Sequence, residues 1–202
     1  MSAGTRYDRL YFDKWYRDPT HRVRSHAELR RQVDFVLSTA EFVLNRPVRS
    51  VLDVGCGEGN WRSHLLRHRP SLRYTGVDQS PYAVGRFGAS RNLLSGDITS
   101  LGELPLRPAY DLVVCCGMLN YLPVAQLLRG LDQVAALVGG VAYLEIFSSE
   151  DSCEGDTNWP APKSASWYSR AIREAGLDPI GMQCYVSARG IHRLSALERM
   201  KS

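Results

Sequence analysis

Three glycines at alternate positions, Gly55, Gly57 and Gly59, directly follow the apolar segment "SVLDV" at 50–54. Glycine adopts positive φ angles readily and lets another molecule approach the backbone. A glycine-rich turn between a buried strand and the next helix exposes backbone N–H groups near the helix N-terminus. Such a surface suits an anionic or strongly hydrogen-bonding ligand, although a tight strand–helix turn can also require glycine for packing alone.

Acidic residues recur at or near the ends of three successive predicted strands. They are Asp53, Asp78 and Asp97. Asp78 can accept hydrogen bonds from both hydroxyls of a ribose, and Asp97 can accept one from an exocyclic amine. Ile98 on one side, and Met118 and Leu119 on the other, could cover the faces of a flat ring.

Alternating strands and helices must position these residues. The predicted strands are 50–54, 73–78, 92–97, 110–116 and 141–147, and the predicted helices are 26–44, 60–68, 80–90, 123–138 and 164–176. Ser80 as N-cap and Pro81 mark one helix start, and the pair Gly139–Gly140 marks a helix end. The segments 179–187 and 191–200 are expected to pair as a final hairpin through 188–190, although the last one also fits a helix.

This order of elements is typical of an α/β fold. We predict a doubly wound, mostly parallel seven-stranded sheet with helices on both faces and an antiparallel last strand. Ligands of such sheets bind beyond the carboxyl ends of the strands, where the strand order reverses. The glycine turn lies at that edge.

The chain resembles the class I S-adenosylmethionine-dependent methyltransferases. The stretch "VLDVGCGEG" is similar to their first motif, "GVDQS" to their acidic second and "SGDI" to their third. "YDLVVCCGMLNYL" resembles the fourth motif, and "LVGGVAYLEIF" the fifth strand with its preceding turn. The resemblance covers residues 48–147 closely. It implies a Rossmann-like fold and S-adenosylmethionine as cofactor, with S-adenosylhomocysteine as product.

The resemblance also implies roles for individual residues. Gly55, Cys56 and Gly57 present backbone to the methionine part of the cofactor, and Gly59 opens the helix. Asp53 is implied to contact the loop or the amino group, and Asp78 the ribose. Gln79, Asp97 and Ile98 are implied at the adenine. Cys116, Gly117 and Met118 are implied where the methyl group emerges.

The acceptor is expected to lie against an N-terminal segment, residues 1–25, that precedes a single domain at 26–202. In relatives of this type an aromatic N-terminal segment often closes over the cofactor, and Tyr11 and Trp15 are the candidates here, with Arg24 reaching the cofactor carboxylate. The other aromatic or polar residues expected at this pocket are Tyr16, Asn120, Tyr121, Trp159 and Tyr168. The same aromatic residues could instead simply dock the segment onto the sheet.

No residue is assigned as the catalyst, because a general base is needed only for a protonated, weak acceptor. The candidates are His21, His26, Tyr16 and Asn120. His64 and His68 are separated by four residues on one helix, but we expect a solvated face rather than a metal site. Glu145 is interpreted as a structural or pocket-edge carboxylate.

Several alternatives remain beside a small-molecule O-, N- or S-methyltransferase of the kind found in secondary metabolism. A nicotinamide-dependent dehydrogenase requires G-x-G-x-x-G, whereas Asn60 occupies the sixth position here. A catalytically silent cofactor-binding scaffold and an RNA or protein methyltransferase both stay open. The absence of a [DN]-P-P-[YF] motif argues against methylation of exocyclic or amide nitrogens of adenine or glutamine, and the absence of a Pro-Cys nucleophile argues against base-carbon methylation.

Composition sets the remaining expectations. The chain has 202 residues, a net charge of +4 and five cysteines without paired metal-ligand spacing. Its basic residues are mostly arginine, which is typical of a GC-rich, bacterial genome. No apolar run approaches the ~18 residues of a membrane span, and the N-terminus lacks a signal-peptide core. We expect a cytoplasmic monomer or homodimer without metal, membrane or nucleic-acid partner.

Overall fold

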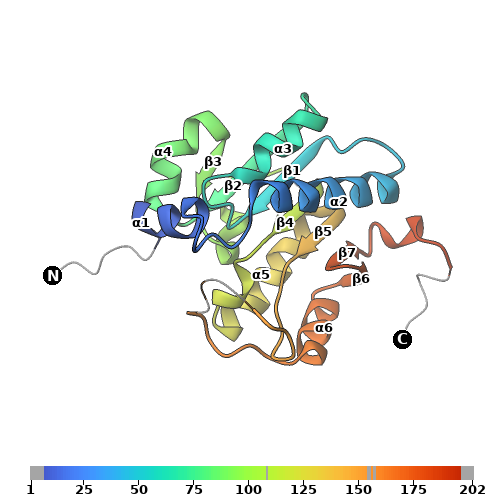
Figure 1. The fold of residues 1–202 in the computed structure, drawn as a ribbon. Coiled ribbons are helices and arrows are strands. Elements are labelled where there is room, and N and C mark those ends of the chain that lie inside the picture. Colours follow the sequence, from blue (N-terminus) through green and yellow to red (C-terminus); the bar gives the residue numbers. More distant parts are fainter. Residues whose placement is uncertain (1–6, 108, 154–155, 157, 197–202) are drawn as a thin grey trace.

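The computed structural model describes residues 7–107, 109–153, 156 and 158–196. Seven strands form one sheet in the order β3-β2-β1-β4-β5-β7-β6 (Figure 1). The strands are β1 (Ser50–Val54), β2 (Arg73–Asp78), β3 (Leu93–Ser95), β4 (Tyr110–Cys115), β5 (Val138–Leu144), β6 (Leu177–Gly181) and β7 (Cys184–Ser187). β7 is antiparallel to both of its neighbours, and the pairs among β1 to β5 are parallel. The predicted fold class is therefore confirmed.

Helices cover both faces of this sheet. The α-helices are α1 (Arg9–Phe12), α2 (His26–Leu44), α3 (Asn60–His68), α4 (Pro81–Arg91), α5 (Val124–Leu137) and α6 (Ala165–Glu174). One π-helical turn, η1 (Asp13–Arg17), continues α1, and short 3₁₀ turns lie at Ile98–Glu103, Leu119–Tyr121 and Ile191–Arg193. Within the part of the chain that is described, no helix is long and apolar enough to cross a membrane.

The predicted helix starts hold because their caps are local. Ser25 caps α2 in a capping box with Glu28, and Ser80 accepts a hydrogen bond from the backbone N–H of Ala83 at the start of α4. Ser164 caps α6 in the same way. A cap satisfies N–H groups that the helix itself leaves free, so its signal is readable within four residues.

The predicted end of α5 and the predicted start of β5 are wrong. Gly139 and Gly140 do not end α5 but lie inside β5, which begins at Val138. A side chain at Gly140 would meet the backbone oxygen of Asp111 at 2.2 Å, so this glycine is required by close approach of β4. Close backbone approach of this kind needs glycine as much as a helix end does.

The predicted C-terminal hairpin is also wrong. β6 and β7 pair with each other, and their turn falls at Met182 and Gln183, not at 188–190. Both turn residues have positive φ, 50° and 60°. Hairpin turns of this type favour Asn-Gly, so Met-Gln gave no signal in the sequence. The segment after β7 makes a 3₁₀ turn at Ile191–Arg193, and residues 197–200 lie outside the described part.

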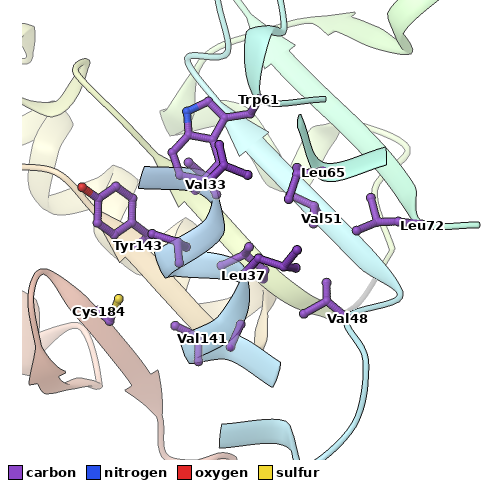
Figure 2. Close-up of a cluster of buried hydrophobic side chains, with 14 of the residues drawn as sticks. Val33, Leu37, Val48, Val51, Trp61, Leu65, Leu72, Val141, Tyr143 and Cys184 are labelled. Atoms are coloured by element: carbon purple, nitrogen blue, oxygen red, sulfur yellow. The ribbon is translucent and has the colours of Figure 1, made fainter. Parts of the chain in front are cut away.

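The sheet separates two cores. Under α2 and α3 the buried side chains include Val33, Leu37, Val51, Trp61 and Val141 (Figure 2). On the other face, α5 and α6 pack Leu127, Leu131 and Ile172 against β1, β4 and β5. Burial of both faces explains why β1 reads as a continuous apolar run rather than an alternating one.

His64 corrects another expectation. It shares the inner face of α3 with Trp61 and Leu65 and is 8% exposed, whereas a solvated position was predicted. Burial lowers the pKa of this imidazole. His68 does face outward and contacts Asp34 through Nε2 at 2.7 Å. Among the described residues no cluster could hold a metal ion.

Candidate active site

The glycine turn after β1 is held from the end of β2. The backbone N–H of Gly57 donates to Asp78 Oδ2 at 2.7 Å, and that of Ser80 donates to Asp78 Oδ1 at 2.8 Å. Gly55, Gly57 and Gly59 all have positive φ, between 53° and 74°. A Cβ atom at Gly55 would meet the side chain of Met118 at 2.6 Å, so the turn must be bare where the loop after β4 approaches it.

A cavity of about 440 Å³ lies at the carboxyl ends of β1, β2 and β3. Its volume falls within the ~300–1,000 Å³ typical of small-molecule sites. Asp78 and Gln79 contribute polar groups, and Ile98 and Met118 contribute apolar ones. The complete lining is Tyr7, Tyr11, Phe12, Tyr16, Gly55, Gly57, Asp78, Gln79, Gly96, Asp97, Ile98, Thr99, Cys116, Gly117, Met118, Tyr121, Leu122 and Gln126. We call it the first cavity.

A second cavity of about 200 Å³ lies beside it, toward the ends of β4 and β5. Both cavities share wall residues at Gly55, Cys116 and Gly117, and both are covered by Tyr11 and Tyr16. Its remaining walls are rich in aromatic rings. The aromatic residues of this second cavity are Tyr11, Trp15, Tyr16, Trp61, Tyr121, Phe147 and Trp159.

The N-terminal segment forms a cover over these cavities, because its Tyr11 and Tyr16 line both of them. Phe12 is buried, and Tyr16 packs edge-on against it with ring centroids 5.0 Å apart. Arg17 Nη2 donates to both carboxylate oxygens of Glu58, in the glycine turn, at 2.6 and 2.7 Å. The Ser80 hydroxyl donates to the backbone oxygen of Tyr7 at 2.6 Å. Two polar contacts therefore fix the segment to the turns after β1 and β2.

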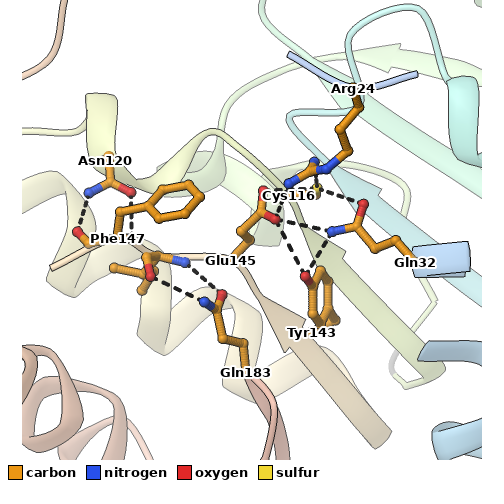
Figure 3. A network of polar contacts seen from close by, with 9 residues as sticks. Arg24, Gln32, Cys116, Asn120, Tyr143, Glu145, Phe147 and Gln183 are labelled. Atoms are coloured by element: carbon orange, nitrogen blue, oxygen red, sulfur yellow. Dashed lines mark hydrogen bonds and ion pairs between the residues drawn. The ribbon is translucent and has the colours of Figure 1, made fainter. Parts of the chain in front are cut away.

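Glu145, just after β5, is the centre of a polar network in the wall of the second cavity (Figure 3). Its Oε1 accepts hydrogen bonds from Arg24 and from Gln32 Nε2, the latter at 3.0 Å. The Cys116 thiol approaches Oε2 at 3.2 Å. Glu145 is only 5% exposed, and the network brings α2, β4 and β5 together at this point.

Burial controls the ionisation of the other acids. Asp53 is 2% exposed, and burial raises its pKa to about 7, although the Tyr74 hydroxyl opposes this by donating to Oδ2 at 2.6 Å. Burial also raises the pKa of Asp78, against the effect of its two backbone N–H donors. The pKa values of Tyr16 and Cys116 are raised in the same way by burial.

Comparison with known proteins agrees with this geometry. Residues 52–140 match the family model of a methyltransferase domain. A tRNA U34 carboxymethyltransferase of Vibrio parahaemolyticus is 36% identical over 118 residues, which cover 54% of this chain and 34% of that protein. A trans-aconitate 2-methyltransferase of Streptomyces avermitilis is 27% identical over 165 residues, which cover 78% of this chain and 58% of that protein. The chain thus spans about a third to three fifths of these curated relatives.

Among solved structures, the sugar N-methyltransferase KedS8 from Streptoalloteichus superposes with a TM-score of 0.61 at 19% identity, covering 77% of this chain and 86% of that one. Residues 52–140 therefore carry the sequence pattern of a methyltransferase domain. The resemblance stated from the sequence agrees with this match over residues 52–140, and the solved structure shares the fold.

The methyltransferase domain brings most of the predicted cofactor residues to the two cavities. Gly55, Gly57, Asp78, Gln79, Asp97, Ile98, Cys116, Gly117 and Met118 line the first, and Trp15, Arg24, Asp53 and Cys56 line the second, with Tyr11 in both. Gly59 lines neither cavity and is the N-cap of α3, the helix-opening position expected of it. Arg24 is engaged with Glu145, so a further contact to the cofactor carboxylate stays a prediction.

The fold places only some of the candidate catalytic residues at the two cavities. Tyr16 lines both cavities and His26 lines the second. His21 is exposed, pairs with Asp18 and is absent from both linings. Asn120 donates to the Phe147 backbone oxygen at 2.7 Å and accepts from its N–H at 3.0 Å, so its whole amide binds backbone. Tyr168 packs in the α6 core instead of the expected pocket.

Sequence reasoning did not identify the contact of Arg17 with Glu58, or Leu122 and Gln126 in the first cavity. Glu58 stands between two of the motif glycines and is 4% exposed. A charge inside such a turn is a readable signal, because a buried carboxylate needs a partner. The partner itself comes from 41 residues upstream, and nothing local encodes that distance.

Proposed function

We propose that the chain transfers a methyl group from S-adenosylmethionine to an O, N or S atom of a small-molecule acceptor. The observation that carries this proposal is the pair of cavities that share Gly55, Cys116 and Gly117 beneath one aromatic cover. The first is the place for an adenosyl group, and the second for the amino-acid end of the cofactor and the acceptor. A reaction between two ligands requires such adjacency.

The residues of the first cavity fit the adenosyl group. Asp78 Oδ1 and Oδ2 each accept one backbone N–H and retain lone pairs for ribose hydroxyls. Ile98 offers an apolar face for the adenine ring, and Asp97 lies beside it. At the second cavity Asp53 and the backbone near Gly55 would hold the amino-acid end. The bound cofactor supplies an electrophilic methyl group on a sulfonium.

The chain's own contribution is position and exclusion of water. Holding two reactants in attack geometry can provide ~7–11 kcal/mol of rate acceleration. Tyr11 and Tyr16 cover the junction of the two cavities, where methyl transfer would take place. Aromatic faces there also stabilise the positive charge as it moves from sulfur toward the acceptor.

A two-part experiment tests the proposal. Calorimetry with S-adenosylhomocysteine should show stoichiometric binding, and a coupled assay should then detect S-adenosylhomocysteine release from S-adenosylmethionine with members of a small-molecule panel. Absence of binding would overturn the proposal. Binding without release on any acceptor would favour a silent scaffold.

The tRNA-modifying relative defines the competing outcome. A nucleic-acid substrate would require binding to tRNA whose affinity falls steeply with salt, because phosphate contacts release counterions. Turnover with tRNA and none with small molecules would show that the acceptor is tRNA and not a small molecule. Cytoplasmic location and the monomer or homodimer state remain predictions.

A further inference from the structure

The second cavity has walls of unusual chemistry for its size. Its volume of about 200 Å³ is less than half of the about 440 Å³ of the first cavity, which favours a compact group beside the amino-acid end of a cofactor. Aromatic side chains and carboxylates dominate the lining. The charged or titratable groups in it are Arg24, His26, Asp53, Glu145 and Asp156, besides the tyrosines and cysteines.

The aromatic rings meet at several angles and form a box. Tyr121 and Trp159 are edge-to-face, with centroids 5.3 Å apart and an interplanar angle of 83°. Phe147 lies nearly parallel to Trp159, with centroids 6.4 Å apart. All three residues line the second cavity, and the π-faces of aromatic rings attract cations.

Glu145 turns one oxygen to this volume. Arg24 and Gln32 occupy Oε1, whereas among the described residues Oε2 has only the Cys116 thiol, a weak donor. A Cβ built on Gly117 would lie 3.7 Å from Oε2, and Gly117 lines both cavities. Oε2 therefore borders the junction at which the methyl group would be transferred, with capacity to accept another hydrogen bond.

Three carboxylates against one guanidinium make the wall electrostatically unsuited to an anionic acceptor. An alkoxide or phenolate beside Glu145 would face a like charge in a buried site, which is unfavourable. The same wall favours methylation of an amine, because in that reaction the positive charge leaves sulfur and appears on nitrogen. Carboxylates and ring faces stabilise that charge where it develops.

We propose that the acceptor is a compact amine, held in the box of Tyr121, Phe147 and Trp159 with an N–H donated to Glu145 Oε2. This inference rests on the proposed function and specifies its substrate class. The ammonium releases one proton through Glu145 to water, and the freed lone pair forms the N–C bond as the methyl–sulfur bond breaks. The electron pair of that bond stays on sulfur, which gives a methylated ammonium ion and S-adenosylhomocysteine.

The test uses two ligands of the same shape that cannot react. With the chain saturated by S-adenosylhomocysteine, calorimetry compares cyclohexylamine, a cation at pH 7.5, with cyclohexanol. We expect the amine to bind at least about tenfold more tightly, since buried cation–π contacts favour the cation over the neutral alcohol. Equal binding, or tighter binding of the alcohol, would overturn the inference.

Two variants test whether the charge of Glu145, rather than the shape of the cavity, causes the preference for the amine. Glu145→Gln should reduce the preference for the amine to about twofold, while Glu103→Gln, an exposed glutamate outside both cavity linings, should keep it. If Glu145→Gln fails to fold, Trp159→Leu serves instead and should weaken the amine more than the alcohol. A preference unchanged in the folded variant contradicts the assignment.

The outcomes also separate this inference from the proposed function. If S-adenosylhomocysteine itself does not bind, the methyltransferase proposal fails first. If it binds and alcohols or thiols are methylated while amines are not, the methyltransferase proposal stands and only the amine assignment is refuted.

Discussion

Two buried carboxylates at neighbouring strand ends differ because their hydrogen-bond donors differ. Asp78 receives backbone N–H groups from Gly57 and Ser80 and so fixes the geometry of both turns. Among the described residues, Asp53 receives one hydrogen bond, from the Tyr74 hydroxyl. Burial raises the pKa of Asp53 to about 7, which places its ionisation within the physiological range. The first residue supports the cofactor loop, and the second can make cofactor binding sensitive to pH.

The affinity for S-adenosylhomocysteine should therefore rise with pH and level off above about 7. An ammonium group binds the ionised form of Asp53, and the free chain must first lose that proton at lower pH. Affinity should change by roughly tenfold per pH unit well below the pKa and very little above it. Calorimetry from pH 5.5 to 8.5 measures this. A flat profile would show that Asp53 does not contact the amino group.

Two variants identify the group responsible. Asp53→Asn should abolish the pH dependence and leave weak, constant affinity. Tyr74→Phe removes a donor that lowers the pKa of Asp53, so the inflection should move to higher pH. An inflection that stays in place in Tyr74→Phe would assign the titration to another group.

At the scale of elements, the ion pair of Arg17 with Glu58 ties the α1–η1 segment, which lines both cavities, to the glycine turn. The Arg17 side chain is 45% exposed and that of Glu58 only 5%, so loss of Arg17 leaves a buried carboxylate without its cation. Further long-range polar contacts of the N-terminal segment include Arg24 on Glu145 and the Ser80 hydroxyl on the Tyr7 backbone oxygen. The pair with Glu58 should therefore govern how often the cover opens.

Arg17→Met should weaken S-adenosylhomocysteine binding by about tenfold, less than the full ~3–5 kcal/mol of a broken buried pair because Arg17 is half exposed. Hydrogen exchange in residues 7–24 should accelerate in the same variant. Arg9→Met is the matched control, since Arg9 pairs with Asp13 on the surface with a side chain 76% exposed. Unchanged exchange and affinity in Arg17→Met would show that aromatic packing alone holds the segment.

The register of β4 against β5 depends on a glycine that looked like a helix end. Gly140→Ala would press a methyl group against the Asp111 carbonyl at 2.2 Å, and we expect a loss of about 1–3 kcal/mol in the free energy of unfolding. Gly85→Ala, inside α4, meets nothing within 4 Å and should gain about 0.5–1 kcal/mol. Urea unfolding of both variants measures the contrast. Equal effects would contradict the packing argument.

Features encoded by neighbouring residues were predictable from the sequence, and features encoded by distant ones were not. The Ser80–Pro81 start of α4 and the glycine turn after β1 are local and were predicted. The hairpin at Met182–Gln183 contains none of the residues that favour such turns. Without knowledge of β4, Gly140 could mark either a helix end or a close approach between strands. The Glu145 network joins α2, β4 and β5, so sequence could suggest a pocket-edge carboxylate but not its donors.

At the scale of the whole molecule, the N-terminal segment adds cover to a sheet that already has both of its cores. The two buried clusters draw their members from Val33 to Leu194, and the segment before α2 contributes none of them. Its buried Phe12 lies instead at the first cavity. The predicted division into a cover at 1–25 and a domain at 26–202 therefore makes a thermodynamic prediction.

A chain that begins at Ser25 should still unfold in one cooperative transition, but without the stabilisation that the cofactor product gives the full chain. Binding at one hundred times Kd stabilises a folded protein by ~2.7 kcal/mol, and this shift should appear in the full chain with S-adenosylhomocysteine. In the shortened chain the same ligand concentration should give a much smaller shift, because Tyr11, Phe12 and Tyr16 no longer cover the first cavity. Urea titrations with and without ligand measure both quantities. Loss of the cooperative transition would show that the segment belongs to the folding unit, and an undiminished ligand shift would show that it does not contribute to binding.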